Sequence, residues 1–151
     1  MFSDGLETID QSAFSETSLE NVKLPASLRK IAQGAFAWCE SLKTVTFKDG
    51  LEVLGTDEYD DDGEMLCGVF EGSSVENVDL PSTLKRIEYS AFENCYNLIS
   101  IELPQQLESI GKRSFFGTGL TQILFPRSLK SIGEAAFYGS KLVSIDFQRN
   151  S

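Results

Sequence analysis

The residues whose types and spacing come nearest to a chemical site lie in the acidic segment 56–66. Four of them match positions 1, 3, 5 and 6 of an EF-hand calcium loop: Glu58, Asp60, Asp62 and Gly63. Position 12 of such a loop supplies a bidentate glutamate, but here it is Val69. The segment is therefore an incomplete calcium candidate. The alternatives are a solvated acidic loop that keeps the chain soluble and a contact with a partner through Tyr59.

Other catalytic chemistry has little support in the sequence. The chain contains no histidine, which excludes Ser-His-Asp and Cys-His nucleophile systems and every histidine-ligated metal site. No glycine-rich loop opens a long helix that would hold phosphate. We therefore expect a protein that is not an enzyme and that carries no cofactor.

The three cysteines are too few for a disulfide framework. Cys39 and Cys95 each follow a repeated phenylalanine by three residues. The same position in the other repeats holds small, weakly polar residues: Thr17, Ser73, Thr118 and Ser140. This pattern predicts a structural stack whose side chains bond to backbone groups in a turn. Cys67 lies outside the pattern and has no assigned role.

The composition restricts the partners that the chain can bind. The net charge is −10, which argues against nucleic acid and against an anionic membrane surface, because both attract basic proteins. No apolar run approaches the roughly 18–20 residues that span a bilayer. The first residues lack the pattern of a signal peptide, and we expect the chain to be a fragment of a longer protein.

A repeat of 22 or 23 residues must position any functional side chain. Each copy opens on a leucine: Leu6, Leu28, Leu51, Leu84, Leu107 and Leu129. The third interval is 33 residues, because 11 residues are inserted near 56–66. A repeat of this length cannot bury its own apolar face and must stack on its neighbours. The sequence therefore predicts a single repeat array over residues 1–151.

Two halves can be distinguished within each repeat. One half has the form L-x-x-I-x-L/F, whose alternation predicts a short strand with one buried face. Stacked copies should pair as a parallel sheet with these residues inward: Val22, Leu24, Val45, Phe47, Val78, Leu80, Ile101, Leu103, Ile123, Phe125, Ile145 and Phe147. A proline ends the strand in four repeats, because it has no N–H to donate.

The other half should hold a short extended piece, L-x-x-I, followed by one turn of α-helix or 3-10 helix. That turn carries a phenylalanine at the same position of every repeat, and the six rings should stack as a buried spine: Phe14, Phe36, Phe70, Phe92, Phe115 and Phe137. A buried core explains this aromatic series better than a cofactor site does.

The motif L-P-x-x-L-x-x-I-x-x-x-A-F-x-x-C-x-x-L-x-x-I, seen at 24–45 and 80–101, resembles the BspA-like leucine-rich repeat family. The resemblance extends over essentially the whole chain. It implies a curved, right-handed α/β solenoid with short parallel strands on its concave face. It also implies a secreted or cell-surface protein that binds a host or matrix protein or mediates adhesion. No buried asparagine follows the strand, in contrast to the commoner leucine-rich repeat.

The outward residues of the predicted strands are the candidate binding surface. We expect a protein or glycan to bind there through the following residues: Thr44, Thr46, Asn77, Asp79, Ile99, Ser100, Glu102, Gln122, Leu124, Val143 and Ser144. Ile99, Leu124 and Val143 are apolar on a face that should be wet, and such a patch often marks a contact surface. Ordinary solvent-facing residues are the alternative interpretation. A structural spacer that associates end to end is the alternative function.

Overall fold

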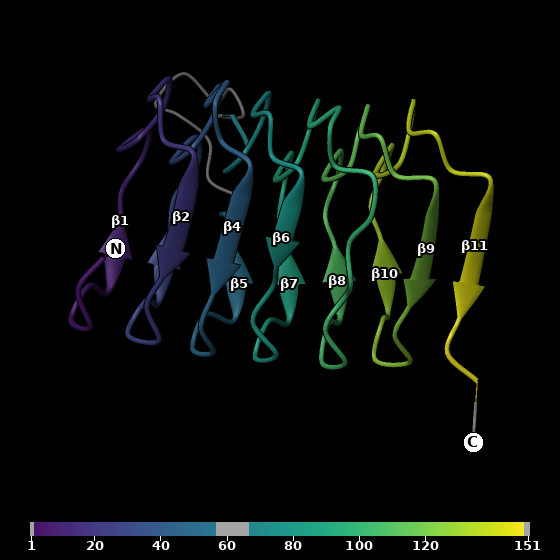
Figure 1. Ribbon diagram of the computed structural model, residues 1–151. Helices are drawn as coiled ribbons and strands as arrows, with labels where there is room; N and C mark the ends of the chain where they lie inside the picture. Colours follow the sequence, from purple (N-terminus) through teal and green to yellow (C-terminus); the bar gives the residue numbers. More distant parts are fainter. Residues whose placement is uncertain (1, 57–66, 150–151) are drawn as a thin grey trace.

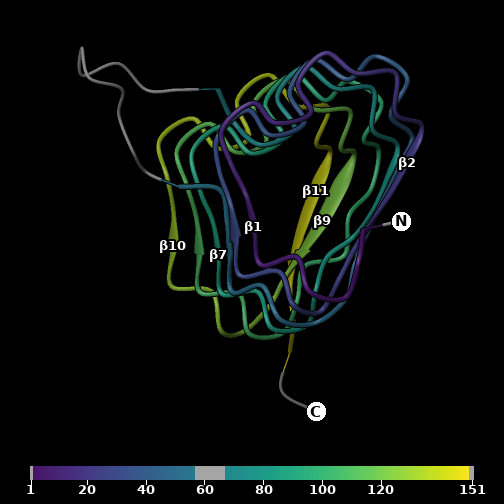
Figure 2. The same ribbon diagram turned by 90° about the vertical axis from the view of Figure 1, so that its left-hand side faces the viewer.

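The computed structural model describes residues 2–56 and 67–149 as a stack of parallel turns. The strands form two layers, which Figure 2 shows on opposite sides of the superimposed turns. The long-strand layer, in front in Figure 1, contains β2 (Asn21–Leu24), β4 (Thr44–Phe47), β6 (Asn77–Asp79), β9 (Gln122–Phe125) and β11 (Ser144–Phe147). The short-strand layer contains β1 (Thr8–Ile9), β3 (Lys30–Ile31), β5 (Val53–Leu54), β7 (Arg86–Ile87), β8 (Ser109–Ile110) and β10 (Ser131–Ile132).

Equivalent positions of neighbouring repeats pair in parallel, as the sequence predicts. In the long-strand layer Asn21 is opposite Thr44, which in turn is opposite Asn77. The strand β9 pairs with β11 in the same way. Burial alternates along β2 and β9 with the period of two that a half-buried strand requires. The L-x-x-I segments supply the second, short-strand layer, which confirms the extended piece expected there.

The long-strand layer is interrupted at residues 100–103, where the repeat predicts a strand and the structure has none. Within the described part of the chain these four residues make no backbone hydrogen bond. In the β4–β6 pair Thr46 is opposite Asp79, which occupies the equivalent position of the next repeat. If residues 100–103 continued this register, Glu102 would be directly opposite Asp79. Like charges directly opposite each other destabilise strand pairing. No other neighbouring pair in this row of outward residues has like charges.

The phenylalanine spine predicted from the sequence is present. Successive rings from Phe14 to Phe137 lie 5.2–5.5 Å apart and within 3–14° of parallel. The four central rings are fully buried: Phe36, Phe70, Phe92 and Phe115. Offset-stacked rings at this separation attract one another beyond the area that they bury. The spine therefore joins the repeats into one core.

The predicted helical or 3-10 turns are not confirmed, because residues 2–56 and 67–149 contain no helix. The α/β class is accordingly replaced by a β-solenoid over those residues. Left-handed residues flank the spine phenylalanine, such as Gly34 (φ 64°) and Trp38 (φ 57°) around Phe36. Such residues cannot continue a right-handed helix. The turn N–H groups bond across repeats instead, as Phe36 N does to Val69 O at 2.8 Å.

The column of cysteine, serine and threonine forms the structural stack expected from the sequence. The Cys95 thiol is fully buried and donates to the backbone oxygen of Phe70 at 3.1 Å. The Thr118 hydroxyl donates to the backbone oxygen of Phe115 at 3.0 Å. Each of these two carbonyl oxygens also accepts a backbone N–H, from Ser73 and Thr118, so the side-chain bond adds a second donor. Cys39 bonds to Phe14 O in the same way.

The last turn departs from the predicted inward set. Ile145 and Phe147 are 54% and 63% exposed, whereas the equivalent Ile123 and Phe125 of the preceding turn are buried. The difference arises because a solenoid turn is covered by the next turn along its axis. No later turn within the described residues covers β11.

Candidate binding surface on the long-strand layer

The predicted binding residues occupy outward positions of the long-strand layer or flank them. Thr44 and Thr46 of β4 are half-buried. The other nine are exposed: Asn77, Asp79, Ile99, Ser100, Glu102, Gln122, Leu124, Val143 and Ser144. Seven of them occupy every second position along the layer, where an extended backbone directs side chains away from the core. Ile99 and Val143 directly precede Ser100 and Ser144 and are exposed beside them. The surface is therefore available to a partner along most of the array.

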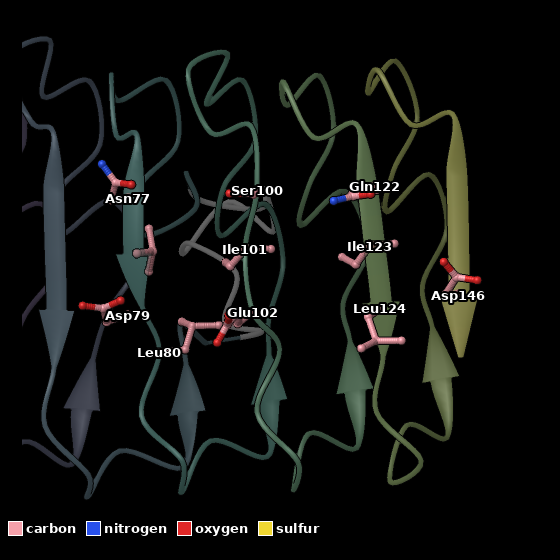
Figure 3. Close-up of a pocket in the computed structure, with 11 residues that line it drawn as sticks. Asn77, Asp79, Leu80, Ser100, Ile101, Glu102, Gln122, Ile123, Leu124 and Asp146 are labelled. Carbon is pink, nitrogen blue, oxygen red and sulfur yellow. The ribbon is translucent and has the colours of Figure 1, made fainter. Parts of the chain in front are cut away.

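A pocket of about 600 Å³ opens where the layer is interrupted. Figure 3 shows Asn77, Ser100 and Gln122 in one row, and Asp79 and Glu102 in another, with Ile101 and Ile123 between the two rows. The full lining is Asn77, Val78, Asp79, Leu80, Ser100, Ile101, Glu102, Gln122, Ile123, Leu124 and Asp146. The volume falls in the range of pockets that bind small ligands or parts of larger ones, roughly 300–1,000 Å³.

The structure brings together six of the eleven predicted residues in this pocket. They are Asn77, Asp79, Ser100, Glu102, Gln122 and Leu124. The other five lie outside it: Thr44, Thr46, Ile99, Val143 and Ser144. The sequence prediction missed Asp146, which belongs to the same outward column as Asp79, Glu102 and Leu124. The position of Asp146 in this column is the sequence signal for it, although the candidate list left it out.

The three apolar residues do not form one continuous cluster. Leu124 lines the pocket, while Ile99 and Val143 lie on the layer outside it. Thr121 separates these two, because its N–H donates to Ile99 O at 3.3 Å and its oxygen accepts from Val143 N at 2.9 Å. The expected apolar patch is thus divided by polar side chains.

The pocket has an acidic lining. Asp79, Glu102 and Asp146 contribute carboxylates, and no lysine or arginine is among the described residues that line it. The short-strand layer is different, because its charges are paired between neighbouring repeats. Lys85 pairs with Glu52 at 3.2 Å and Lys130 with Glu108 at 2.9 Å. Part of the excess negative charge of the molecule therefore lies in this pocket, on the outward side of the long-strand layer.

Ionisable groups with shifted pKa values lie elsewhere. Burial raises the pKa of the Glu71 carboxyl, which accepts a hydrogen bond from Gly68 N. Partial burial also raises the pKa of the Cys67 thiol, with a further contribution from the negative charge of Glu71. A hydrogen bond from Lys130, with its charge, lowers the pKa of Glu108. A thiol with a raised pKa is a poorer nucleophile at neutral pH.

The calcium candidate Glu58, Asp60 and Asp62 lies outside the described residues. Among residues 2–56 and 67–149, no group of three or more histidine, cysteine, aspartate or glutamate side chains is placed to hold a metal ion. The same residues include no helix that is long and apolar enough to cross a membrane.

Comparison with known proteins identifies the repeat. The family model described as BspA type leucine rich repeat region matches residues 1–61 and 65–151 with six copies. The chain belongs to the BspA-type leucine-rich repeat family. A search of curated proteins found no match.

Solved structures of leucine-rich repeat proteins share this fold. A leucine-rich repeat protein from Bacteroides ovatus is 31% identical with a TM-score of 0.81, over 96% of this chain and 36% of that one. The T. pallidum protein TpLRR is 29% identical with a TM-score of 0.67, over 83% of this chain and 57% of that one. A leucine rich cell surface protein from Faecalibacterium prausnitzii is 26% identical with a TM-score of 0.68, over 86% of this chain and 32% of that one. The BspA-type chain thus spans between about a third and just over half of their lengths.

Proposed function

We propose that this BspA-type repeat array is a non-enzymatic binding module of a secreted or cell-surface protein. It binds a macromolecular partner, a protein or a glycan, through the outward side of the long-strand layer. The concave placement of that layer, which the family resemblance implies, is part of the proposal. The observation that carries it is the pocket of about 600 Å³ between β6 and β9, to which six of the predicted residues contribute.

Two further observations support this function. The solvent-facing positions of the long-strand layer vary between repeats, while the buried positions repeat almost unchanged. This division is what a scaffold with a specific surface requires. The similarity to a leucine rich cell surface protein supports the proposed location.

The proposal is tested by binding of the 151-residue chain to purified extracellular-matrix proteins and to a glycan array, measured by surface plasmon resonance. We expect at least one ligand to bind the wild type and to bind S100K/Q122K/L124K at least tenfold more weakly. The lysine side chains fill the pocket but point away from the core, so the circular dichroism spectrum should not change.

The matched control is Q105K/Q106K/S131K, which adds the same charge at exposed positions away from the pocket. Its affinity should stay within twofold of the wild type. The proposal is wrong if no ligand in either panel binds, or if both lysine variants lose affinity equally.

A second candidate function is end-to-end stacking as a structural spacer. It rests on the exposed apolar side chains of the last turn: Ile132, Ile145 and Phe147. Another copy stacked there would bury them and pair the free edges of β10 and β11. Light scattering should then show a mass that rises with concentration, and F147K should reduce it. A constant monomer mass at high concentration contradicts this function.

A further inference from the structure

We propose that the interruption of the long-strand layer at residues 100–103 receives an extended segment of a partner protein that carries lysine or arginine. This inference rests on the proposed function and specifies the class of partner. The occupant is recognised in two ways, by backbone groups that the layer leaves unpaired and by the carboxylates of Asp79, Glu102 and Asp146.

The backbone at the interruption is available for pairing. In the described chain, residues 100–103 make no hydrogen bond, and β6 and β9 pair only with β4 and β11 on their far sides. Two strand edges and a free segment therefore face one opening. Unpaired N–H and C=O groups along a strand are a template for another extended chain, and addition of such a chain is a common mode of peptide recognition. Figure 1 shows the interruption as the trace without an arrow between β6 and β9.

The interruption is confined to one layer, so it is a local feature of a stable array. Behind it the short-strand pairs β7–β8 and β8–β10 are intact. The spine rings Phe92 and Phe115 also stack normally at 5.4 Å. A partner segment could therefore bind there without unfolding the core.

The charge at the opening favours a cationic segment. Three carboxylates line it with no described lysine or arginine among them. A lysine or arginine placed between Asp79 and Glu102 would replace their repulsion with two attractions. The row of carboxylates runs across the strands, because its members occupy equivalent positions of different repeats. A segment paired with a strand edge runs along the strands, so one lysine or arginine of it would meet Asp79 and Glu102. Gln122 and Ser100 add neutral donors and acceptors for the rest of the segment.

Other occupants fit the opening less well. These carboxylates do not form a group that could hold a metal ion, within the described part of the chain. The lining contains no aromatic side chain among the described residues, whereas a flat apolar surface is what the faces of a sugar ring would stack on. An anionic glycan would also be repelled.

The test is an NMR titration of the ¹⁵N-labelled 151-residue chain with a seven-residue peptide of alternating lysine and threonine. We expect amide shifts confined to residues 77–80, 100–103 and 122–125. The D79N/E102Q variant should bind at least tenfold more weakly, and D146N severalfold more weakly. The control E20Q/E40Q removes two exposed carboxylates outside the pocket and should stay within twofold.

Two peptide controls separate backbone pairing from simple charge attraction. The same peptide N-methylated at every residue keeps the side-chain charge but cannot donate backbone hydrogen bonds, and should bind at least tenfold more weakly. A peptide of alternating glutamate and threonine should cause no shifts. Equal loss of affinity in D79N/E102Q and E20Q/E40Q would overturn the inference, as would shifts spread over both layers or the absence of any shift.

The result distinguishes this inference from the broader proposal. If a matrix ligand binds the wild type but not S100K/Q122K/L124K, while the basic peptide causes no shifts, only the inference is wrong. If the basic peptide binds in the opening and no matrix protein or glycan does, the inference stands and the broader function is wrong.

Discussion

The thiol of Cys95 donates a hydrogen bond to the backbone oxygen of Phe70, 25 residues earlier and one turn back along the array, at 3.1 Å. One buried bond thus links the turn of one repeat to the spine residue of the preceding repeat. Burial raises the pKa of this thiol to about 12. The same residue is therefore a structural donor and an unreactive thiol.

The three thiols should differ in reactivity. At pH 8 in the native state, a disulfide reagent such as dithiobisnitrobenzoate should modify Cys67, which is exposed. Cys39 and Cys95 are buried and should react only after unfolding in urea. The released chromophore should correspond to one thiol and then to three. The C67S variant should release none before unfolding, and rapid native reaction of two or more thiols would contradict the assignment.

The phenylalanine spine should make a large contribution to stability. F92A removes a fully buried ring between two stacked neighbours and should lower the free energy of unfolding by about 3–5 kcal/mol. F14A should cost less, because Phe14 is only partly buried at the first turn. Urea unfolding followed by circular dichroism measures both. The control Y96A changes an exposed ring, and a loss there equal to that of F92A would argue against the spine.

Glu93 and Arg113 form an ion pair whose two side chains should be coupled in their contributions to the free energy of unfolding. The Arg113 guanidinium donates to both carboxylate oxygens, and the Glu93 side chain is 8% exposed. R113M leaves that carboxylate buried without its partner and should cost about 1–3 kcal/mol of stability. A double-mutant cycle with E93Q should show that the losses are not additive. The control cycle at Lys85 and Glu52, an exposed pair, should give a coupling of roughly 0–1 kcal/mol; equal couplings would reject the prediction.

The stability contribution of Glu71 should depend on pH. Burial raises the pKa of this carboxyl above its ordinary value of 4.5, so the folded state favours its protonated form. The resulting stabilisation is present below pH 4.5 and is lost as the pH rises through the folded value. E71Q is neutral throughout and its amide oxygen can still accept from Gly68 N. Urea unfolding should therefore show that E71Q gains stability relative to the wild type when the pH is raised from 4 to 7. A difference in the free energy of unfolding that is the same at both pH values would contradict this.

The interruption of the long-strand layer should close when the like charges are removed. The E102T variant carries threonine at position 102, as β4 does at the equivalent position 46. Without the charge of Glu102, residues 100–103 should pair with β6. Hydrogen exchange of these amides should then slow at least tenfold relative to the wild type. E20T changes an exposed carboxylate away from the interruption and should leave their exchange unchanged. Fast exchange in E102T would mean that charge is not the cause.

Much of the fold followed from the sequence because each repeat obeys the same burial rule. Leucine, isoleucine and phenylalanine at fixed intervals must face a common core, and this requirement predicted the stacked strands, the phenylalanine spine and the column around Cys95. The outward residues of the pocket followed from the alternation of the strands. Asp146 was missed because the candidate list left out the last member of the column that holds Asp79, Glu102 and Leu124.

The absence of helical turns from residues 2–56 and 67–149 could not be predicted in this way. A sequence such as Gly34-Ala35-Phe36 is compatible with a helix until the neighbouring repeat offers Val69 O to the Phe36 N–H. Hydrogen bonds between repeats then offset the energetic cost of the left-handed backbone at residues such as Trp38. The choice depends on a partner 33 residues away, which no local pattern contains.

The sequence by itself determined the repeat, its inward residues and the side chains that face the solvent, because burial of apolar groups recurs with the period of the backbone. Only the tertiary structure decided where that regularity ends. Residues 100–103 have the same pattern as the strands beside them, yet a continued register would place Glu102 opposite Asp79, and like charges of neighbouring repeats meet only when the repeats stack. The exposure of Ile145 and Phe147 has the same origin, because the burial of a side chain in a solenoid depends on the turn that covers it.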